Sequence, residues 1–328
     1  MRQLTCSGPG TLEWREVPAP RLEGDLEALV HIRTRLGEAC HSCGQYQDAA
    51  TLFRQNIAAL AGDGALERFG LLQPPAVHSR TWLAASLSEL GMFQEARAIA
   101  AEALTIAQQI DEPVALNFAW AATGQVALQL GEFDEAVRAL ERAVQVWRGD
   151  TPPWQPRFTG ALGLAFALSG DPARGIVLLD SALEQTATLG VLSGRSVLLV
   201  WLAEARLLAT RDAEACEAAA EAIELATRHG ERGHLARALS ARANALTRGG
   251  ADHLERAARI YGEACALADE LHMRPLVAHC RFGLGTLYAH AGKREQASVE
   301  LVTVRELFGA MGMEPWRARA AHALDELG

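Results

Sequence analysis

The sequence predicts an all-α solenoid built from about seven pairs of antiparallel helices and closed by one further helix. Hydrophobic residues make up 49% of the chain but aromatic residues only 6%, which is typical of closely packed helices rather than sheets. A turn position recurs with a period of about forty residues, within the range of helical repeats, and small residues keep register with it. The turn positions are Gly44, Gly91, Gly131, Gly170, Thr210, Gly250 and Gly292.

Three small-residue positions accompany each turn, and small side chains are expected where two helices approach most closely. The first position, before the turn, holds Gly37, Ala84, Gly124, Gly163, Ala203, Ala243 and Gly285. The second, after the turn, holds Ala49, Ala96, Ala136, Gly175, Ala215, Ala257 and Ala297. The third, where the second helix meets the next pair, holds Ala103, Ala143, Ala182, Ala222 and Ala264, with Asn56 and Val304 at the ends.

The last unit carries the pattern most fully. Leu284-Gly285, Tyr288, Gly292 and Ala297 resemble the core of a tetratricopeptide repeat, which implies a right-handed solenoid with a concave inner face. The period exceeds the ~34 residues of the standard repeat and overlaps HEAT-like lengths. The small-residue signature favours the tetratricopeptide family.

Three stretches narrow the resemblance to one group. Ser79–Gly91, Glu231–His234 and Met273–His279 are similar to the carboxy-terminal repeat regions of bacterial signalling proteins. Those proteins carry a nucleotide-cyclase-like domain and an AAA-type ATPase upstream. Neither domain is present in this sequence, so the resemblance implies neither activity.

The predicted organisation has three parts: a short non-helical segment over residues 1–28, the repeat array over 29–312, and a capping helix over 313–328. In the first part, Gly8-Pro9-Gly10 separates two short runs of strand type. Residues 1–30 also resemble the start of a zinc-type medium-chain alcohol dehydrogenase, through Trp14–Pro20 and Glu27–Val30. No Gly-x-Gly-x-x-Gly follows a strand. The resemblance therefore leaves, as an alternative, an inactive remnant of a dehydrogenase fusion.

Local signals support the helix boundaries within the array. Gly170-Asp171-Pro172 places a stop glycine, an N-cap acid and a first-turn proline in the order that a new helix requires. We expect Asp134 to cap the helix after Gly131 in the same way. Longer connections are expected over 61–77 and 149–156. The capping helix carries an apolar stripe, formed by Trp316, Ala320, Ala323, Leu324 and Leu327.

Composition and motifs argue against several classes of function. The formal net charge of −9 disfavours nucleic acid and anionic membranes as partners. Lys293 is the one lysine of the sequence, so a phosphate-binding Gly-x-x-x-x-Gly-Lys loop cannot occur. A nucleophile elbow and a His-Glu-x-x-His zinc motif are also missing. We therefore predict no catalytic residue, no metal ligand and no cofactor, and a chain that is not an enzyme.

The six cysteines are scattered through helical patterns, with neither a secretory signal nor an apolar span of membrane length. Reduced thiols in a cytoplasmic protein are the expected state. Cys40-His-Ser-Cys43 could suggest a metal or redox site. A zinc site needs a second ligand pair, which the sequence does not contain, so we interpret these two cysteines as structural.

The candidate binding surface is the concave face, which the first helix of each unit lines in tetratricopeptide proteins. The alternative for any single residue is an ordinary solvated inner surface. Trp82, Trp120 and Trp201 are expected to pack, whereas Trp154 in a proline-rich connection leaves an exposed binding role open. The candidate residues are His31, Glu38, His41, His78, Glu89, Phe118, Gln125, Gln129, Arg157, Glu204, Arg237, Asn244, Arg248, His279, Phe282 and His290.

The sequence therefore predicts a non-catalytic interaction module, in bacterial signalling or transcriptional regulation, that binds a peptide or helix in its concave groove. The first alternative is an array that senses a small molecule or peptide and changes its superhelical pitch. The predicted partner is a protein or peptide. The sequence leaves self-association open.

Overall fold

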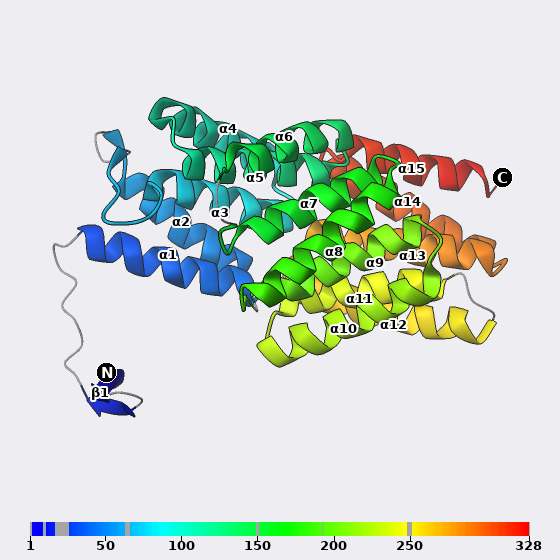
Figure 1. Ribbon diagram of the computed structural model, residues 1–328. Helices are drawn as coiled ribbons and strands as arrows, with labels where there is room; N and C mark the ends of the chain where they lie inside the picture. The colour runs from blue at the N-terminus through cyan, green and yellow to red at the C-terminus, as the bar shows by residue number, and fades with distance from the viewer. Residues whose placement is uncertain are drawn as a thin grey trace.

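The computed structural model describes residues 2–8, 11–16, 26–62, 66–148, 151–191, 193–247 and 251–327. In these ranges a two-stranded antiparallel hairpin, β1 (Arg2–Gly8) and β2 (Thr11–Glu16), precedes fifteen α-helices (Figure 1). The helices form seven successive antiparallel pairs and a closing helix, which confirms the predicted helical-repeat solenoid. Gly250 and Arg248 lie outside the described residues.

The helices are long enough for three to five turns each, and their bounds follow the predicted units. They are α1 (Leu26–Ser42), α2 (Tyr46–Ala59), α3 (Pro75–Glu89), α4 (Phe93–Ile110), α5 (Pro113–Leu130), α6 (Phe133–Val146), α7 (Gln155–Leu168), α8 (Pro172–Thr188), α9 (Arg195–Leu208), α10 (Asp212–His229), α11 (Arg232–Leu246), α12 (Ala251–Glu270), α13 (Arg274–His290), α14 (Arg294–Ala310) and α15 (Glu314–Asp325).

Two predicted boundaries differ from the structure. The array begins at Leu26, before the predicted boundary at residue 29. Glu27 lies in the first turn of α1, where its negative charge interacts favourably with the positive end of the helix dipole. Asp134 does not cap α6, because Glu132 occupies the N-cap position and Asp134 lies inside the first turn. Asp171 is the N-cap of α8 as predicted, and its Oδ1 accepts a hydrogen bond of 3.1 Å from the Arg174 backbone N–H.

The predicted turn positions adopt the left-handed backbone that ends one helix and starts the next. Gly44, Gly91, Gly131, Gly170 and Gly292 have φ between 72° and 107°, and Thr210 at φ 60° takes the same conformation. The small positions are buried. Two backbones approach closely between α7 and α8, where a Cβ added to Gly163 would lie 2.8 Å from the carbonyl oxygen of Gly175. A side chain there would therefore push two backbones apart.

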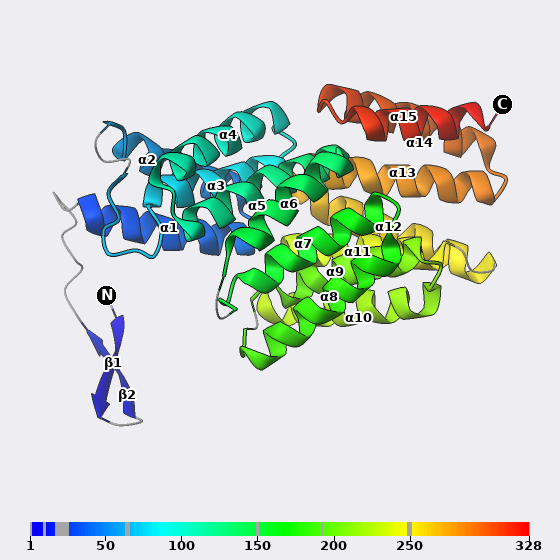
Figure 2. The same ribbon diagram turned by 45° about the horizontal axis from the view of Figure 1, so that its top comes forward.

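The solenoid winds far enough for its late repeats to touch its early ones. A Cβ added at Gly91 would lie 3.3 Å from Cδ of Pro275, and one at Gly131 would lie 2.8 Å from Nε1 of Trp316. α3 contacts α13, and α15 begins beside the turn between α5 and α6 (Figures 1 and 2). We call this contact between successive superhelical turns the seam.

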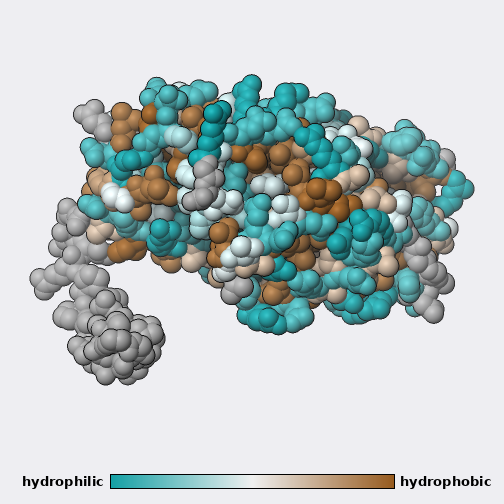
Figure 3. Space-filling model, in the orientation of Figure 1, coloured by the Kyte–Doolittle hydropathy of each residue, from teal (hydrophilic) through white to brown (hydrophobic). Residues whose placement is uncertain are grey.

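Apolar packing continues across the seam. One buried cluster joins Phe53, Leu83 and Leu87 of the first two pairs to Leu301 and Phe308 of α14. The predicted stripe of α15 packs against the same cluster. Burial of this kind contributes about 25 cal/mol per Å², so the seam is part of the hydrophobic core. On the face seen in Figure 3, hydrophobic residues lie between rims of hydrophilic ones.

Candidate functional site

Winding around one turn brings polar side chains of distant repeats together on the inner face of the solenoid. We call this group the inner cluster. Its titratable groups come from six helices, α1, α2, α3, α7, α9 and α11. They lie close enough for the charge of one to shift the pKa of another. The inner cluster consists of His41, Tyr46, Glu89, Arg157, Glu204, Glu231, His234 and Arg237.

An ion pair between Glu89 and Arg237 crosses the seam. The Arg237 Nη2 donates to Glu89 Oε2 at 2.6 Å, although the two residues are 148 positions apart in sequence. Gln129 of α5 donates to the other carboxylate oxygen at 3.3 Å. Burial alone would lower the pKa of Arg237, but Glu89, Tyr46 and Glu204 raise it above its usual value. The sequence placed all three polar partners on the inner face.

The guanidinium of Arg157 differs from that of Arg237 in having no partner within the described residues. Burial lowers the pKa of its guanidinium, while the charges of Glu89, Tyr46 and Glu231 act in the opposite direction. Among the described residues, none forms a hydrogen bond or ion pair with the side chain of Arg157. Its five N–H donors are therefore open to solvent or to a ligand.

Glu204 lies near Arg237 without a direct hydrogen bond to it among the described residues. Burial raises the pKa of this carboxyl to about 7, and Arg237 only partly offsets that effect. Near neutral pH, Glu204 therefore exists in both protonation states. The inner cluster can therefore change its net charge near neutral pH, a range in which carboxylates exposed to water do not titrate.

His41 is buried against the aromatic side chains at the first pair. Its ring lies edge-on to Tyr46 at 5.1 Å and to Trp82 at 5.0 Å. Nδ1 lies 2.9 Å from Ser86 Oγ, and since Ser86 already donates to the Trp82 carbonyl, Nδ1 carries the proton. Burial, together with the nearby Arg157, His234 and Arg237, lowers the pKa of His41 well below its usual value.

Three further residues meet at the start of α9 and α11, and the sequence reasoning did not select them. Ser196 Oγ donates to Glu231 Oε2 and lies 2.9 Å from His234 Nδ1, which is 3.4 Å from the same carboxylate oxygen. Burial raises the pKa of Glu231, but the hydrogen bonds from His234 and Ser196 lower it below its usual value overall. A serine nucleophile would donate to the histidine instead, so this geometry is that of a positioned carboxylate.

The other predicted residues form two separate groups. Near the amino-terminal end, His78 Nε2 lies 2.7 Å from Glu38 Oε1, and the His78 ring neighbours Phe118 at 6.2 Å. His31 lies further out, with Nε2 2.8 Å from the Phe69 carbonyl oxygen. Gln125 of α5 is partly buried.

Near the carboxy-terminal end, the His279 ring lies edge-on to Trp316 at 4.5 Å and burial lowers its pKa to about 3. Phe282 packs against the cluster that contains Phe308. Asn244 and His290 are exposed, and Asn244 accepts a hydrogen bond from Tyr261. The contacts of the described candidates therefore divide between the inner cluster and these two groups.

Three tryptophans pack against other side chains, and the two cysteines of the Cys-x-x-Cys motif are free thiols. Trp82 and Trp201 pack against buried apolar clusters. Trp154 does the same rather than facing outward, because its Nε1 donates to Asn117 Oδ1 at 3.0 Å and its ring contacts Phe118. Cys40 is buried and Cys43 exposed, and both are free thiols. No group of metal-binding side chains occurs within the described ranges.

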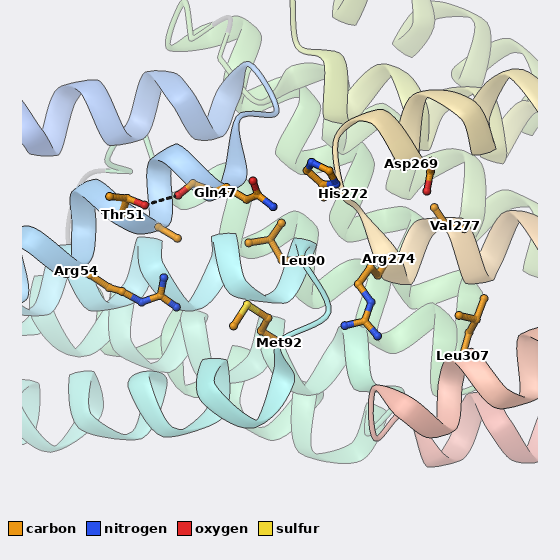
Figure 4. Close-up of a pocket in the computed structure, with 11 residues that line it drawn as sticks. Gln47, Thr51, Arg54, Leu90, Met92, Asp269, His272, Arg274, Val277 and Leu307 are labelled. Carbon is orange, nitrogen blue, oxygen red and sulfur yellow. Dashed lines mark hydrogen bonds between the residues drawn. The ribbon is translucent and has the colours of Figure 1, made fainter.

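The seam also forms a surface pocket that the sequence did not suggest (Figure 4). Its volume is about 490 Å³. Arg54 and Arg274 lie on opposite sides of Leu90 and Met92. Arg54 pairs with Glu95 at 2.7 Å. Because the pocket lies between α2–α4 on one side and α12–α14 on the other, a repeat-by-repeat view of the sequence cannot detect it.

Comparison with known proteins supports the repeat assignment. Residues 77–149 match the family described as tetratricopeptide repeat, so the chain contains such repeats. A search of curated proteins gave no match. The resemblance of residues 1–30 to an alcohol dehydrogenase finds no support. None of the described helices combines the length and apolar character that a bilayer crossing requires.

The similarity to solved structures extends over most of the chain. A crystal structure of a Rap protein complexed with Competence and Sporulation Factor has a TM-score of 0.65 and 12% identity, over 91% of this chain and 85% of that chain. A Signal Transduction ATPase with Numerous Domains from Pyrococcus horikoshii, with a tetratricopeptide repeat sensor, has a TM-score of 0.47 and 16% identity, over 92% of this chain and 45% of that chain. For yeast Tom70 the TM-score is 0.45 and the identity 14%, over 94% and 61%.

Proposed function

We propose that this protein is a non-catalytic interaction module in bacterial signalling or transcriptional control that holds a peptide segment on its inner face. The observation that carries the proposal is the inner cluster, in which one solenoid turn collects charged side chains from distant repeats. Some of these side chains form ion pairs with one another, and others form none within the described residues. The Rap protein of the same fold was solved as a complex, which supports a binding role for such an architecture.

Polar groups of this kind suit a peptide better than an apolar ligand. A peptide presents alternating amide donors and acceptors, and side-chain amides and carboxylates match them. Gln125 and Glu204 lie on the inner face, partly buried, and neither makes a side-chain hydrogen bond within the described part of the chain. Such groups gain by binding a partner that replaces their water.

A displayed peptide library tests the proposal. Peptides captured by the purified chain are re-tested on Gln125→Glu and Glu204→Gln, two inner-face changes that preserve side-chain size. We expect the captured peptides to bind one or both variants at least about tenfold more weakly. A change of this size corresponds to the loss of one charge-assisted or ordinary hydrogen bond. Arg138→Gln on the exposed side of α6 is the matched control and is expected to bind normally.

Two results would contradict the proposal. One is that no peptide is captured above background. The other is that captured peptides bind all four proteins equally, which would place their site on another surface.

A second candidate function has its own observation. The seam pocket joins two superhelical turns, so a small molecule bound there would change the contact between them and with it the pitch. A compound screen by thermal unfolding is expected to find ligands that raise the midpoint. The rise should disappear in Met92→Arg, which fills the pocket, and persist in Val177→Arg at a position 67% exposed elsewhere. A screen without a stabilising compound would exclude this candidate.

A further inference from the structure

Arg157 and the first turn of α9 face each other on the inner surface. A Cβ added at Gly194, the N-cap of α9, would lie 3.9 Å from Nη1 of Arg157. Gly194 has no side chain with which to cap the helix. The backbone N–H groups of Arg195, Ser196 and Val197 have no acceptor among the described residues. The guanidinium therefore lies beside a helix terminus whose first N–H donors find no acceptor in the described part of the chain.

Both features attract an anion for independent reasons. The start of a helix carries about half a positive charge and free N–H donors. Arg157 is partly buried, and its guanidinium adds a full positive charge and makes no hydrogen bond or ion pair within the described ranges. The two carboxylates whose charges act on Arg157 already have hydrogen-bond partners. Arg237 and Gln129 bind Glu89, while Ser196 and His234 bind Glu231.

We infer that Arg157 and the first turn of α9 form a binding site for a carboxylate group of the ligand. The planar guanidinium can donate two parallel hydrogen bonds to a carboxylate, and the α9 N–H groups supply further donors. This inference rests on the proposed function, because it names the group through which the inner face holds its peptide.

The surrounding charges favour a singly charged anion over phosphate. Glu231 is held by Ser196 in the first turn of α9, and Glu89 and Glu204 lie in the same cluster. A dianion would meet three acidic groups and only two arginines. A carboxylate brings one negative charge to the one arginine without a partner. The site is therefore specific for carboxylates on electrostatic grounds.

Thermal unfolding of the full chain tests the inference with sodium acetate, acetamide and sodium phosphate at equal ionic strength. Acetate is expected to raise the midpoint, acetamide to leave it unchanged, and phosphate to raise it less than acetate. Arg157→Gln should weaken the apparent affinity for acetate at least about tenfold. Arg138→Gln, which removes one exposed arginine from α6, should keep the full response.

The source of the carboxylate is read from three capped probes. These are N-acetyl-dialanine, its amide, and N-acetyl-aspartic acid amide. A larger midpoint rise with free N-acetyl-dialanine than with acetate indicates a peptide carboxy-terminus. A larger rise with the aspartic acid amide indicates an acidic side chain. If neither exceeds acetate, the source is a small acid.

Removal of Arg157 separates a binding role from a structural one. Because its charge is buried without a partner, Arg157→Gln should fold with an unchanged or higher midpoint in the absence of acetate. Arg157→Lys keeps the charge but loses the planar pair of donors, so its acetate response should fall between the wild type and Arg157→Gln. A lower midpoint for both variants without acetate would instead show that Arg157 holds the fold together, and would overturn the inference.

Other results would also overturn it: equal responses to acetate and acetamide, a larger response to phosphate, or a full acetate response in Arg157→Gln. If these occur while the inner-face peptides of the previous test still bind, the carboxylate site is wrong and the interaction module stands. If both tests fail, both proposals fall.

Discussion

The seam makes a prediction that a simple open solenoid does not. In Gly131→Ala, the new methyl group would lie 2.8 Å from Nε1 and 3.0 Å from Cδ1 of Trp316, and 3.1 Å from Cβ of Pro315. The indole is held between His279 and Phe308, so it cannot move away freely. Overpacking of this kind costs about 1–3 kcal/mol. The left-handed backbone at φ 88° adds about 1–2 kcal/mol for any residue with a Cβ.

Gly292→Ala is the matched control for the backbone contribution. Gly292 occupies the corresponding turn of the last pair at φ 72°, and a Cβ there would have no atom within 4 Å. Urea unfolding followed by far-ultraviolet circular dichroism compares the two variants. We expect Gly131→Ala to lose about 1–3 kcal/mol more than Gly292→Ala. Equal losses would refute the seam, because only a contact with α15 distinguishes the two sites.

Three further predictions concern the charges of the inner face. Glu204 has a folded pKa raised to about 7, so its contribution to stability is complete below pH 4.5 and is lost as pH rises through 7. Glu204→Gln should therefore be more stable than wild type by about 2 kcal/mol at pH 8 and equal to it at pH 4 in urea titrations. His279 has the opposite sign, because its folded pKa is lowered to about 3. The contribution of His279 to stability is complete above pH 6.5 and is lost as pH falls toward 3. His279→Phe should therefore reduce the acid-induced loss of unfolding free energy by about 2 kcal/mol at pH 4. Glu89→Gln should cost about 3 kcal/mol by leaving Arg237 uncompensated, and adding Arg237→Gln should recover part of that loss. A double variant no more stable than Glu89→Gln would contradict the ion pair.

The sequence predicts the helices and turns of this protein because each depends on residues close in the chain. Gly170-Asp171-Pro172 ends one helix and starts the next wherever it occurs, and the structure reproduces it. Asp134 shows the limit of such signals. An acid near a helix start can cap it or lie in its first turn, and the dipole favours both positions. The choice depends on a shift of two residues, which local chemistry does not determine.

The seam could not be predicted in the same way. The repeat period states how each unit packs on its neighbour, but the superhelical turn depends on small rotations summed over several units. Trp316 appears in sequence as part of an apolar stripe on the last helix. That its indole rests on Gly131 follows only from the summed rotation.

The inner face was predicted from the register of the repeats alone. Register states that Glu89, Gln129 and Arg237 face inward, but it does not state that they meet. Ser196 and Glu231 were not predicted, because register selects only the inner positions of the first helices and neither residue occupies one. Glu231 lies at the N-cap of α11, and its signal was the short stretch Glu231–His234, which entered the reasoning only through its resemblance to a family.

The seam and the inner cluster lead to different predictions for the two candidate functions. The ion pair of Glu89 with Arg237 crosses the seam and uses the donors of Arg237, whereas Arg157 takes no part in closing the solenoid. A ligand bound at Arg157 therefore leaves the seam intact, and it stabilises the folded chain by mass action without a change of pitch. A ligand in the seam pocket must instead alter the distance between two turns. Small-angle scattering distinguishes these cases, since an unchanged radius of gyration on binding favours the interaction module and an altered one favours the sensing array.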